Sequence, residues 1–577
     1  MTFRYPLILL TLFCLGGFAE AQPAFRQDYF TPPINISMYL SGNFGELRSN
    51  HFHSGIDIKT QGVSGHRIFA SAEGYISRIK VEAAGYGNTV YITHPAGYTT
   101  VYAHLDRFRQ DIADYVKELQ YTQEKHALNI YPEKGEWTVE KGEFIAFSGS
   151  SGYSFGPHLH FEIRNAANQA PMNVLLFGFD IADDVAPRVM SVYLYPMDKQ
   201  SHVNGDGGKL RFHVEADSAG YRLKDMPELM ANGRIGFGIE AFDYLNGARN
   251  RCGLYSIVML IDGELKYQWK MDQFKFSESR YINSYIDYEE RQKNNRLVQK
   301  TYLEPNNRLG LYEYVEDEGV CDFSADREYQ VSFVLEDAHA NSTRLSFKVR
   351  GGQSYAVPPS PPIDDFVQKF SWNLPNEFRK EDVVLTVPKG SLYVNQDFTY
   401  QKSEPVNGSW SPVHHIHHTH TPMHLSAELA IQADSLPKNL RNKAYLGYLN
   451  GEDGHTEAAG GEWKEGMVRS KIRTFGRYTV LVDTIAPELN PLNLGGSKDM
   501  SAKTSIRFRV RDQESGIKSY EGYIDNHWVL IEYDLKNNLV FYRFDPERLE
   551  RGKNHELELY IIDNKDNIAY YYTDFYW

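Results

Sequence analysis

The stretch GYISRIKVEAAGYGNTVYITHPAGYTTVYAHL, residues 74–105, decides the fold of the N-terminal part of this chain. Apolar and aromatic residues alternate with polar residues in three segments of strand length, and glycine-containing turn sequences separate these segments. Alternation with a period of two places every second side chain on the same face of a β-sheet. The pattern therefore predicts a β-meander, and similar short segments continue through residues 30–175.

One segment in this part has the period of a helix instead. In DIADYVKELQY, residues 111–121, the apolar residues Ile112, Tyr115, Val116 and Leu119 recur at the spacing of one helix face. We expect a helix here, inserted between two strands and packed on the sheet through that face.

The length and composition of the chain indicate several folded domains. Its 577 residues exceed what a single hydrophobic core serves, so we expect three or four domains. The 40 Tyr and 32 Phe, many of them alternating with polar residues, favour strands, and the predicted fold class is all-β. The formal net charge of −14 gives no reason to expect nucleic acid as a partner.

The N-terminus, MTFRYPLILLTLFCLGGFAEAQ, has the features of a secretory signal peptide. A basic residue, Arg4, precedes an apolar run at 7–18, and the tripeptide AEA at 19–21 forms a small-residue cleavage site. The run is shorter than the roughly 20 residues that a membrane anchor needs. We expect residues 1–21 to be cleaved and the mature protein to be exported without a membrane span.

Sequence motifs repeat between the middle and the end of the chain. DDVAPR at 183–188 is echoed by DTIAPE at 483–488. Each copy later carries a strand-like run that contains Asp-x-x-x-Asn, VLEDAHAN in the first and IIDNKDN in the second. The repeat predicts two modules of one kind at 183–350 and 483–577. Alternating strands with turn residues between them suggest immunoglobulin-like β-sandwiches.

Between these modules the composition indicates a linker and another domain. GGQSYAVPPSPPIDD at 351–365 is rich in proline and predicts a stiff, extended linker. Residues 366–482 contain further alternating segments, and we expect them to form a β domain. Two cysteines remain after cleavage of the signal peptide, Cys252 and Cys321. Export permits a disulfide between them, and two buried free thiols are the alternative.

Two groups of polar residues outside the N-terminal part suggest metal binding, which we do not favour. Single aspartates at strand ends more often close Asx turns than bind calcium, and this applies to Asp243, Asp262, Asp512, Asp525 and Asp563. The tract HHIHHTHTPMH at 414–424 is rich in histidine, but no carboxylate or cysteine accompanies it closely. We expect either weak adventitious metal binding or a solvated strand there.

The strongest chemical signal lies in two short segments. In GPHLHFEI, His158 and His160 are two positions apart in a predicted strand and project from the same face. In HFHSGIDI, three residues that include Gly55 separate His53 from Asp57, which suits a bent strand. Two histidines and one carboxylate with an open position form a catalytic zinc arrangement. A single H-x-H pair is weak evidence, so the hypothesis depends on the combination of both segments.

Three motifs, in this order, resemble those of the lysostaphin/LytM-type zinc metalloendopeptidases. They are HSGIDI with His53 and Asp57, YAHL with His104, and GSSGYSFGPHLHFEI with His158 and His160. The connecting segments AEGYISRI and GYGNTVYITH also match that framework, and the resemblance covers residues 38–165. It implies a LytM-type peptidase domain at 22–180, built on an antiparallel sheet with the helix as an insertion.

The family resemblance also implies roles for five residues. In that family one zinc ion is held by the His and Asp of the first motif and by the last His of H-x-H. Carried over to this chain, the ligands of one Zn²⁺ ion are His53, Asp57 and His160. His104 and His158 are then the catalytic histidines that do not bind the metal. Which of these two histidines acts as the base stays open.

The function implied by the resemblance is that of an exported zinc metalloendopeptidase. It would hydrolyse peptide bonds in the stems or cross-links of peptidoglycan through zinc-activated water and the two histidines. The expected location is the periplasm or cell envelope of a Gram-negative bacterium, or the secreted fraction. Two alternatives are a non-catalytic LytM-type regulator of cell-wall amidases and an adhesive or scaffold protein that binds envelope partners through its β modules. All five expected positions are filled, which argues against the regulator.

Overall fold

The computed structural model describes residues 25–225, 228–352, 365–451, 455–494 and 498–577. Strands predominate in these ranges, which confirms the predicted all-β class. The predicted signal peptide at 1–21 and the proline-rich part of the predicted linker, at 353–364, lie outside the described residues. None of the helices in the described ranges is long and apolar enough to span a membrane.

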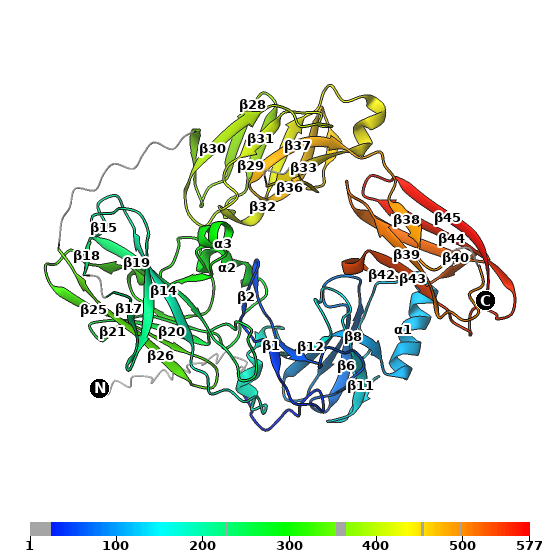
Figure 1. The fold of residues 1–577 in the computed structure, drawn as a ribbon, viewed down its shortest axis with the longest axis horizontal. Coiled ribbons are helices and arrows are strands. Elements are labelled where there is room, and N and C mark those ends of the chain that lie inside the picture. Colours follow the sequence, from blue (N-terminus) through cyan, green and yellow to red (C-terminus); the bar gives the residue numbers. More distant parts are fainter. Residues whose placement is uncertain (1–24, 226–227, 353–364, 452–454, 495–497) are drawn as a thin grey trace, which may run out of the picture.

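Four β regions follow one another around a ring, and each contacts two neighbours (Figure 1). The last region, drawn in orange and red, returns to the first region, drawn in blue and cyan, beside helix α1 (Gln110–Gln123). Side-chain hydrogen bonds cross all four joints: Asn43 to Gly253, Asn306 to Leu392, Lys443 to Asn567, and Lys117 to Asp545. The ring thus brings the end of the chain next to the region that carries the histidine motifs.

The first region is built on an antiparallel sheet. Its strands are β1 (Leu40–Gly42), β4 (Ile56–Lys59), β5 (Arg67–Phe69), β6 (Gly74–Val81), β7 (Asn88–Thr93), β8 (Tyr98–Phe108), β9 (Leu128–Ile130), β10 (Thr138–Val139), β11 (Phe144–Ser148), β12 (His158–Asn165) and β13 (Pro171–Met172). The main order is β1-β4-β12-β8-β7-β6-β10, so the consecutive strands β6, β7 and β8 form the predicted meander. β12 lies between β4 and β8, which places the two histidine-rich segments side by side.

Helix α1 is the insertion that the helical spacing predicts. Ile112 and Val116 on its apolar face are buried in the core of the first region. Lys117 lies on another face and forms an ion pair with Asp545 of the last region. The helix therefore has two partners, its own sheet through apolar packing and the last region through charged contacts.

The second region forms one 13-stranded sheet in the described ranges, in which β17 and β18 pair in parallel with β26. Residues from both halves of the sheet share one core, so the sheet folds over on itself. An immunoglobulin-like sandwich has two separate sheets, and that assignment stays a prediction. The elements are β14 (Arg188–Pro196), β15 (His202–Val203), β16 (Leu210–Asp217), β17 (Gly220–Leu223), β18 (Leu229–Asn232), β19 (Arg234–Phe242), β20 (Ser256–Ile261), β21 (Glu264–Lys270), α2 (Ile282–Tyr285), α3 (Tyr288–Asn294), β22 (Val298–Lys300), β23 (Tyr312–Val315), β24 (Cys321–Asp322), β25 (Glu328–Glu336) and β26 (Ser342–Arg350).

The third region consists of two sheets that share one core. A six-stranded sheet, β27-β30-β31-β37-β33-β34, packs against a five-stranded sheet, β28-β29-β32-β36-β35. The strands are β27 (Phe366–Phe370), β28 (Asn376–Lys380), β29 (Val383–Val387), β30 (Gln396–Ser403), β31 (Val413–Ile416), β32 (Pro422–Gln432), β33 (Ala444–Asn450), β34 (His455–Ala458), β35 (Glu462–Lys464), β36 (Met467–Thr474) and β37 (Gly476–Val482). The structure therefore has strands where the sequence predicts another β domain.

The last region is a smaller sandwich of two four-stranded sheets around one core. The orders are β38-β39-β43-β42 and β41-β40-β44-β45. The strands are β38 (Glu488–Pro491), β39 (Ser505–Arg511), β40 (Ile517–Ile524), β41 (His527–Val529), β42 (Ile531–Asp534), β43 (Leu539–Arg543), β44 (Asn554–Asp563) and β45 (Ile568–Tyr576). Its immunoglobulin-like character also stays a prediction.

The first two regions share an apolar interface. β2 (Leu47–Arg48) and β3 (His51–Phe52) form a separate hairpin in the first region. Phe44 and Phe52, before and within this hairpin, are buried in the core of the second region, while Cys252 of the second region is buried in the core of the first. Because each core contains residues of the other region, the domain boundaries expected from the sequence stay predictions.

Cys252 and Cys321 are both buried free thiols. Cys252 lies in the core of the first region and Cys321 in the core of the second. Of the two alternatives that the sequence leaves open, the structure therefore has the free thiols and not the disulfide.

Candidate metal centre

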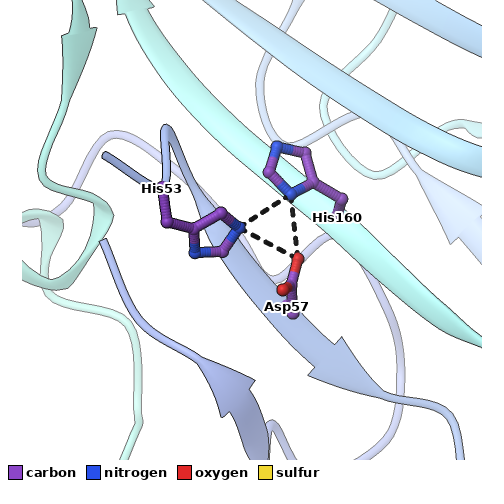
Figure 2. Close-up of side chains that lie close together, drawn as sticks. All are labelled: His53, Asp57 and His160. Atoms are coloured by element: carbon purple, nitrogen blue, oxygen red, sulfur yellow. Dashed lines mark hydrogen bonds and ion pairs between the residues drawn. The ribbon is translucent and has the colours of Figure 1, made fainter. Parts of the chain in front are cut away.

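Three side chains of the histidine motifs meet in the interior of the first region and point toward one another (Figure 2). His53 Nε2 lies 3.1 Å from Asp57 Oδ1 and 3.1 Å from His160 Nδ1. His160 Nδ1 lies 2.9 Å from Asp57 Oδ1, and all three residues are buried. The structure thus brings together, from positions up to 107 apart in the chain, the three residues that the family resemblance implies as zinc ligands.

The strand register places two of these residues opposite each other. Asp57 in β4 pairs with His160 in β12 across an antiparallel ladder, where partners carry their side chains on one face about 5 Å apart. His53 lies in the bend between β3 and β4. Gly55 allows this bend to approach β12, because a Cβ there would lie 2.3 Å from the carbonyl oxygen of Phe161. The predicted bent segment is present, and it aims His53 at the other two side chains.

The outer hydrogen bonds of the two imidazoles fix where their protons lie. His53 Nδ1 donates to the carbonyl oxygen of Asn43 at 2.7 Å, and His160 Nε2 donates to Glu162 Oε1 at 2.8 Å. Because a carbonyl or ionised carboxylate oxygen only accepts, His53 Nε2 and His160 Nδ1 are the nitrogens that offer lone pairs. Together with Asp57 Oδ1, three such atoms face one point, and a cation satisfies all three. Two imidazoles and one carboxylate form a donor set that fits zinc.

The same geometry shifts the pKa values of the three groups. Burial lowers the pKa of His53. Burial also opposes the charged forms of Asp57 and His160, but their neighbours outweigh it. The surrounding imidazoles hold the pKa of Asp57 well below its usual range, and Asp57 and Glu162 raise the pKa of His160 to about 9. At neutral pH the site therefore attracts a proton or a metal ion to its centre, and metal binding displaces the proton.

Glu162, which sequence reasoning missed, lies behind His160. Its fully buried carboxylate accepts hydrogen bonds from Ser54 Oγ (2.7 Å), Tyr86 OH (2.6 Å) and Arg164 Nε (2.5 Å) as well as from His160. Burial raises the pKa of Glu162, but Arg164 and His160 outweigh it and hold this pKa far below the usual range. Glu162 follows His160 by two positions in one strand, so alternation alone could have placed it on the ligand face.

Arg48, also missed, orients Asp57 from the opposite side. Its Nη2 donates to Asp57 Oδ2 at 2.6 Å, which leaves Oδ1 for the cluster. Arg48 Nε lies 3.5 Å from Glu46, whose pKa is raised to about 7, chiefly by burial. β2 carries Arg48 and pairs with β3 in a two-stranded sheet, so no alternation pattern signals its approach to β4.

The two histidines that the resemblance implies as catalytic lie beside the cluster. The ring centroids of His104 and His158 are 4.8 Å apart, and His158 Nε2 lies 3.5 Å from Asp57 Oδ1. Both rings donate through Nδ1 to backbone carbonyls, His104 to Ser151 at 2.8 Å and His158 to Gly156 at 2.9 Å. Each Nε2 therefore offers a lone pair. Burial, followed by the neighbouring imidazoles, lowers the pKa of His104 to about 3.

Other histidines of the chain lie apart from this group. His51 forms a second H-x-H pair with His53 in the sequence, but its side chain is exposed. Among the described residues, no histidine of the tract at 414–424 belongs to a three-ligand cluster. His414 of that tract is buried and bonds to the hydroxyl of Tyr400 at 2.9 Å, so part of the tract is core and not a solvated strand.

Comparison with known proteins agrees with this arrangement. The sequence profile of Peptidase family M23 matches residues 51–122, a segment that contains His53, Asp57 and His104. The chain carries an M23 peptidase domain. The resemblance to the lysostaphin/LytM-type metallopeptidases is thereby confirmed. A second profile, the Zu5-like domain, matches residues 367–483, which form the third region.

Several curated relatives match the part of the chain that includes the M23 domain, among them proteins of Neisseria, Haemophilus and Vibrio. The DD-carboxypeptidase/endopeptidase Mpg of Neisseria meningitidis is 37% identical over 127 residues, 22% of this chain and 23% of that protein. An uncharacterized metalloprotease of Haemophilus influenzae is 34% identical over 163 residues, 28% of each protein. The peptidoglycan DD-endopeptidase ShyA of Vibrio cholerae is 24% identical over 168 residues, 28% of this chain and 33% of that protein. The chain thus spans no more than a third of the length of these three relatives.

Proposed function

We propose that this protein is a zinc-dependent endopeptidase that hydrolyses peptide bonds of peptidoglycan. The observation that carries the proposal is the convergence of three lone-pair atoms, on His53, Asp57 and His160, with two further imidazoles beside them. The M23 domain supports the same chemistry, and relatives named as peptidoglycan DD-endopeptidases indicate the substrate.

In this proposal, three of the five residues bind the metal and the other two transfer protons. His53, Asp57 and His160 would hold one zinc ion, with Glu162 and the Asn43 carbonyl orienting the imidazoles. When bound, zinc lowers the pKa of a water ligand from 15.7 to about 7 and polarises the carbonyl of the scissile bond. His104 and His158 present their Nε2 atoms beside this point, where either can take a proton from water and pass it to the leaving amine. The lowered pKa of His104 keeps its imidazole neutral at pH 7, which is the form that accepts a proton.

The proposed bond is the direct cross-link between D-alanine and diaminopimelate. Relatives from Neisseria and Vibrio are named for DD-endopeptidase activity, and both genera are Gram-negative. Together with the predicted signal peptide, this leads us to propose export to the periplasm or cell envelope. Peptidoglycan with oligoglycine bridges is the alternative substrate, and its cleavage should be measured in parallel.

Purified mature protein tests the proposal. It should contain one zinc ion by elemental analysis and cut cross-linked muropeptide dimers at the D-alanyl–diaminopimelate bond, as identified by mass spectrometry. A strong chelator should stop cleavage and zinc should restore it. His160→Ala should lose both zinc and activity, whereas His51→Ala, which changes an exposed histidine of the same segment, should keep both. Undiminished cleavage by His160→Ala would contradict the proposal, and a folded chain that binds no zinc would favour the amidase regulator instead.

A further inference from the structure

A buried group of carboxylates lies where the chain enters the second region. Asp183, Asp337 and His339 offer ligand atoms that all lie within 4.8 Å of one another. The side chain of Asp183 is 0% exposed, and Asp337 is 2% exposed. A further buried carboxylate, Asp243, follows β19. Burial, together with the nearby negative charges of Asp183 and Asp337, raises the pKa of Asp243 to about 8. Three acidic side chains are therefore crowded together away from solvent.

Two oxygen atoms of this group lack a hydrogen-bond partner. Within the described ranges, Asp183 Oδ2 and Asp243 Oδ1 are buried and accept no hydrogen bond. The other oxygen of Asp183 accepts from the backbone N–H of Val185 at 3.1 Å, and Asp337 Oδ1 accepts from the N–H of Asn341 at 2.9 Å. Turn hydrogen bonds thus hold the carboxylates in place while unpartnered oxygens remain in the interior.

The same arrangement occurs again where the chain enters the last region. Asp483, Asp512 and Asp563 offer ligand atoms within 4.8 Å of one another. Asp483 is 1% exposed and Asp563 0%, and the buried atoms Asp483 Oδ2 and Asp512 Oδ2 accept no hydrogen bond from any described residue. Asp483 Oδ1 accepts from the N–H of Ile485 at 3.1 Å, and Asp563 Oδ1 accepts from that of Asn567 at 2.9 Å.

These contacts match those of the first group residue by residue along the sequence repeat. Asp183 corresponds to Asp483 and Asp337 to Asp563, while Asp243 and Asp512 each follow directly after a strand, β19 and β39. The match extends to the asparagines: Asn341 Nδ2 donates to the carbonyl of Asp183 at 3.2 Å, and Asn567 Nδ2 to that of Asp483 at 3.1 Å. If the acidic residues of one group had come together by chance, the second repeat would not be expected to have an equivalent group.

Protein cations do not neutralise either group. In the part of the chain that the structure describes, no Lys or Arg forms an ion pair with any of the six aspartates, and the single histidine contact joins His339 Nδ1 to Asp183 Oδ2 at 3.5 Å. In the last region Lys565 takes the place of His339, but its Nζ donates to the carbonyl of Gly461 at 2.7 Å. Buried carboxylates without a countercharge are costly, and coordination of a metal ion removes that cost.

We propose that each group binds one calcium ion. The ligands common to both groups are carboxylate oxygens, which hard cations prefer, whereas zinc and its neighbours favour imidazole or thiolate. Asp262 and Asp525 lie at hairpin tips and accept from backbone N–H groups of other strands, those of Gln330 and Glu556. The expectation from the sequence, that single aspartates at strand ends close turns, describes Asp512 and Asp563, each of which accepts from the N–H two positions further on. It describes only part of what Asp563 does, since this residue both closes a turn and belongs to the group.

The position of both groups suggests what the ions do. Asp183 lies between the M23 domain and the first strand of the second region, and Asp483 lies between β37 of the third region and β38 of the last. At the second of these joints Lys443 Nζ donates to Asn567 Oδ1 at 2.7 Å, so the third region already contacts the turn that closes the group. Calcium would therefore fix the direction in which the chain enters each repeated module and stiffen the ring at two of its four joints.

Calcium binding to the full mature chain tests the proposal. Protein freed of metal by a chelator is dialysed against CaCl₂ at concentrations up to about 1 mM, the range of extracellular calcium modules. Bound calcium and zinc are then measured separately by elemental analysis. We expect two calcium ions per chain and a melting temperature that rises when calcium is added.

Matched variants assign the ions. Asp183→Asn and Asp483→Asn keep the oxygen that closes the turn but remove a charge, so each should lose one calcium ion. Asp262→Asn and Asp525→Asn, the equivalent pair at the hairpin tips, should keep two. Absence of bound calcium, with a melting temperature that calcium does not change, overturns the proposal even if a variant fails to fold. Loss of calcium from the tip variants to the same extent overturns the assignment to these residues.

Discussion

Replacing Glu162 with glutamine should weaken zinc binding at the proposed metal centre without changing a proposed ligand. The carboxylate accepts from His160 Nε2, Ser54 and Tyr86 at one oxygen and from Arg164 at the other. A glutamine has only one accepting oxygen. Its NH₂ group must therefore face either Arg164 or the donors His160, Ser54 and Tyr86, and it cannot accept a hydrogen bond from them. Loss of such a support for a ligating histidine typically lowers metal affinity 10- to 100-fold, which is about 1.4–2.7 kcal/mol.

The same substitution should also reduce stability, because Arg164 is left without its charged partner. Breaking a buried ion pair from one side costs about 3–5 kcal/mol. Zinc affinity is measured by competition with a chelator of known affinity, and the free energy of unfolding by denaturant titration of the zinc-free protein. Tyr86→Phe removes one donor to Glu162 but keeps the carboxylate, so its loss of zinc affinity should be smaller. Zinc affinity of folded Glu162→Gln within about twofold of the wild type would refute the reasoning that this carboxylate fixes the proton on His160.

Three further substitutions test other contacts. Arg48→Met leaves Asp57 Oδ2 unpaired, and zinc affinity in the same competition assay should fall about tenfold. Phe52→Ala removes a ring buried in the core of the second region and should lower the free energy of unfolding by about 3–5 kcal/mol, with both regions affected in denaturant titrations. Burial lowers the pKa of His94 to about 4, so the native state binds fewer protons than the unfolded state between pH 4 and 6.5. The free energy of unfolding should therefore fall as the pH drops through this window, by up to about 3 kcal/mol, and His94→Gln should remove that part of the slope.

The three residues of the candidate metal centre could be identified from the sequence because each lies in a local motif with its own spacing, and their role as ligands stays a proposal. The contact between Asp57 and His160 depends on the register of β4 against β12, which alternation alone does not set. Glu162 was within reach of the same alternation, since it follows His160 on the ligand face. Arg48 was not, because its hydrogen bond to Asp57 joins a two-residue strand to a separate sheet.

Those parts of the fold that depend on local periodicity could also be predicted from the sequence. Alternation gave the meander of β6 to β8, and the helical spacing gave α1, since both periods are local. The joints between regions were not predictable, because an apolar residue such as Phe52 has the same pattern whether its own sheet or a neighbour buries it. The two acidic groups were not predicted for a related reason, because their members are far apart in the sequence. Asp337 and Asp563 do close turns, and only the folded chain brings Asp183 and Asp483 beside them.

The proposed calcium group of the second region is connected by short contacts to the metal centre. Asp243 exchanges two backbone hydrogen bonds with Cys252, at 3.1 and 2.9 Å. The next residue, Gly253, exchanges two more with the side chain of Asn43, at 2.8 and 2.9 Å. The carbonyl of Asn43 in turn accepts from His53 Nδ1. An ion that fixes Asp243 should therefore also fix Asn43, whose carbonyl orients the proposed zinc ligand His53.

If both proposals hold, calcium and zinc should bind with positive and reciprocal coupling. Couplings between sites are typically 5- to 150-fold, and a relay of three contacts favours the low end, so saturating calcium should tighten zinc binding about fivefold. Asp183→Asn should abolish this effect, whereas Asp483→Asn should keep it, because its group lies at the joint between the third and last regions and takes no part in these contacts. Equal zinc affinity with and without calcium, in a protein shown to bind two calcium ions, would disprove the connection and leave calcium binding itself intact.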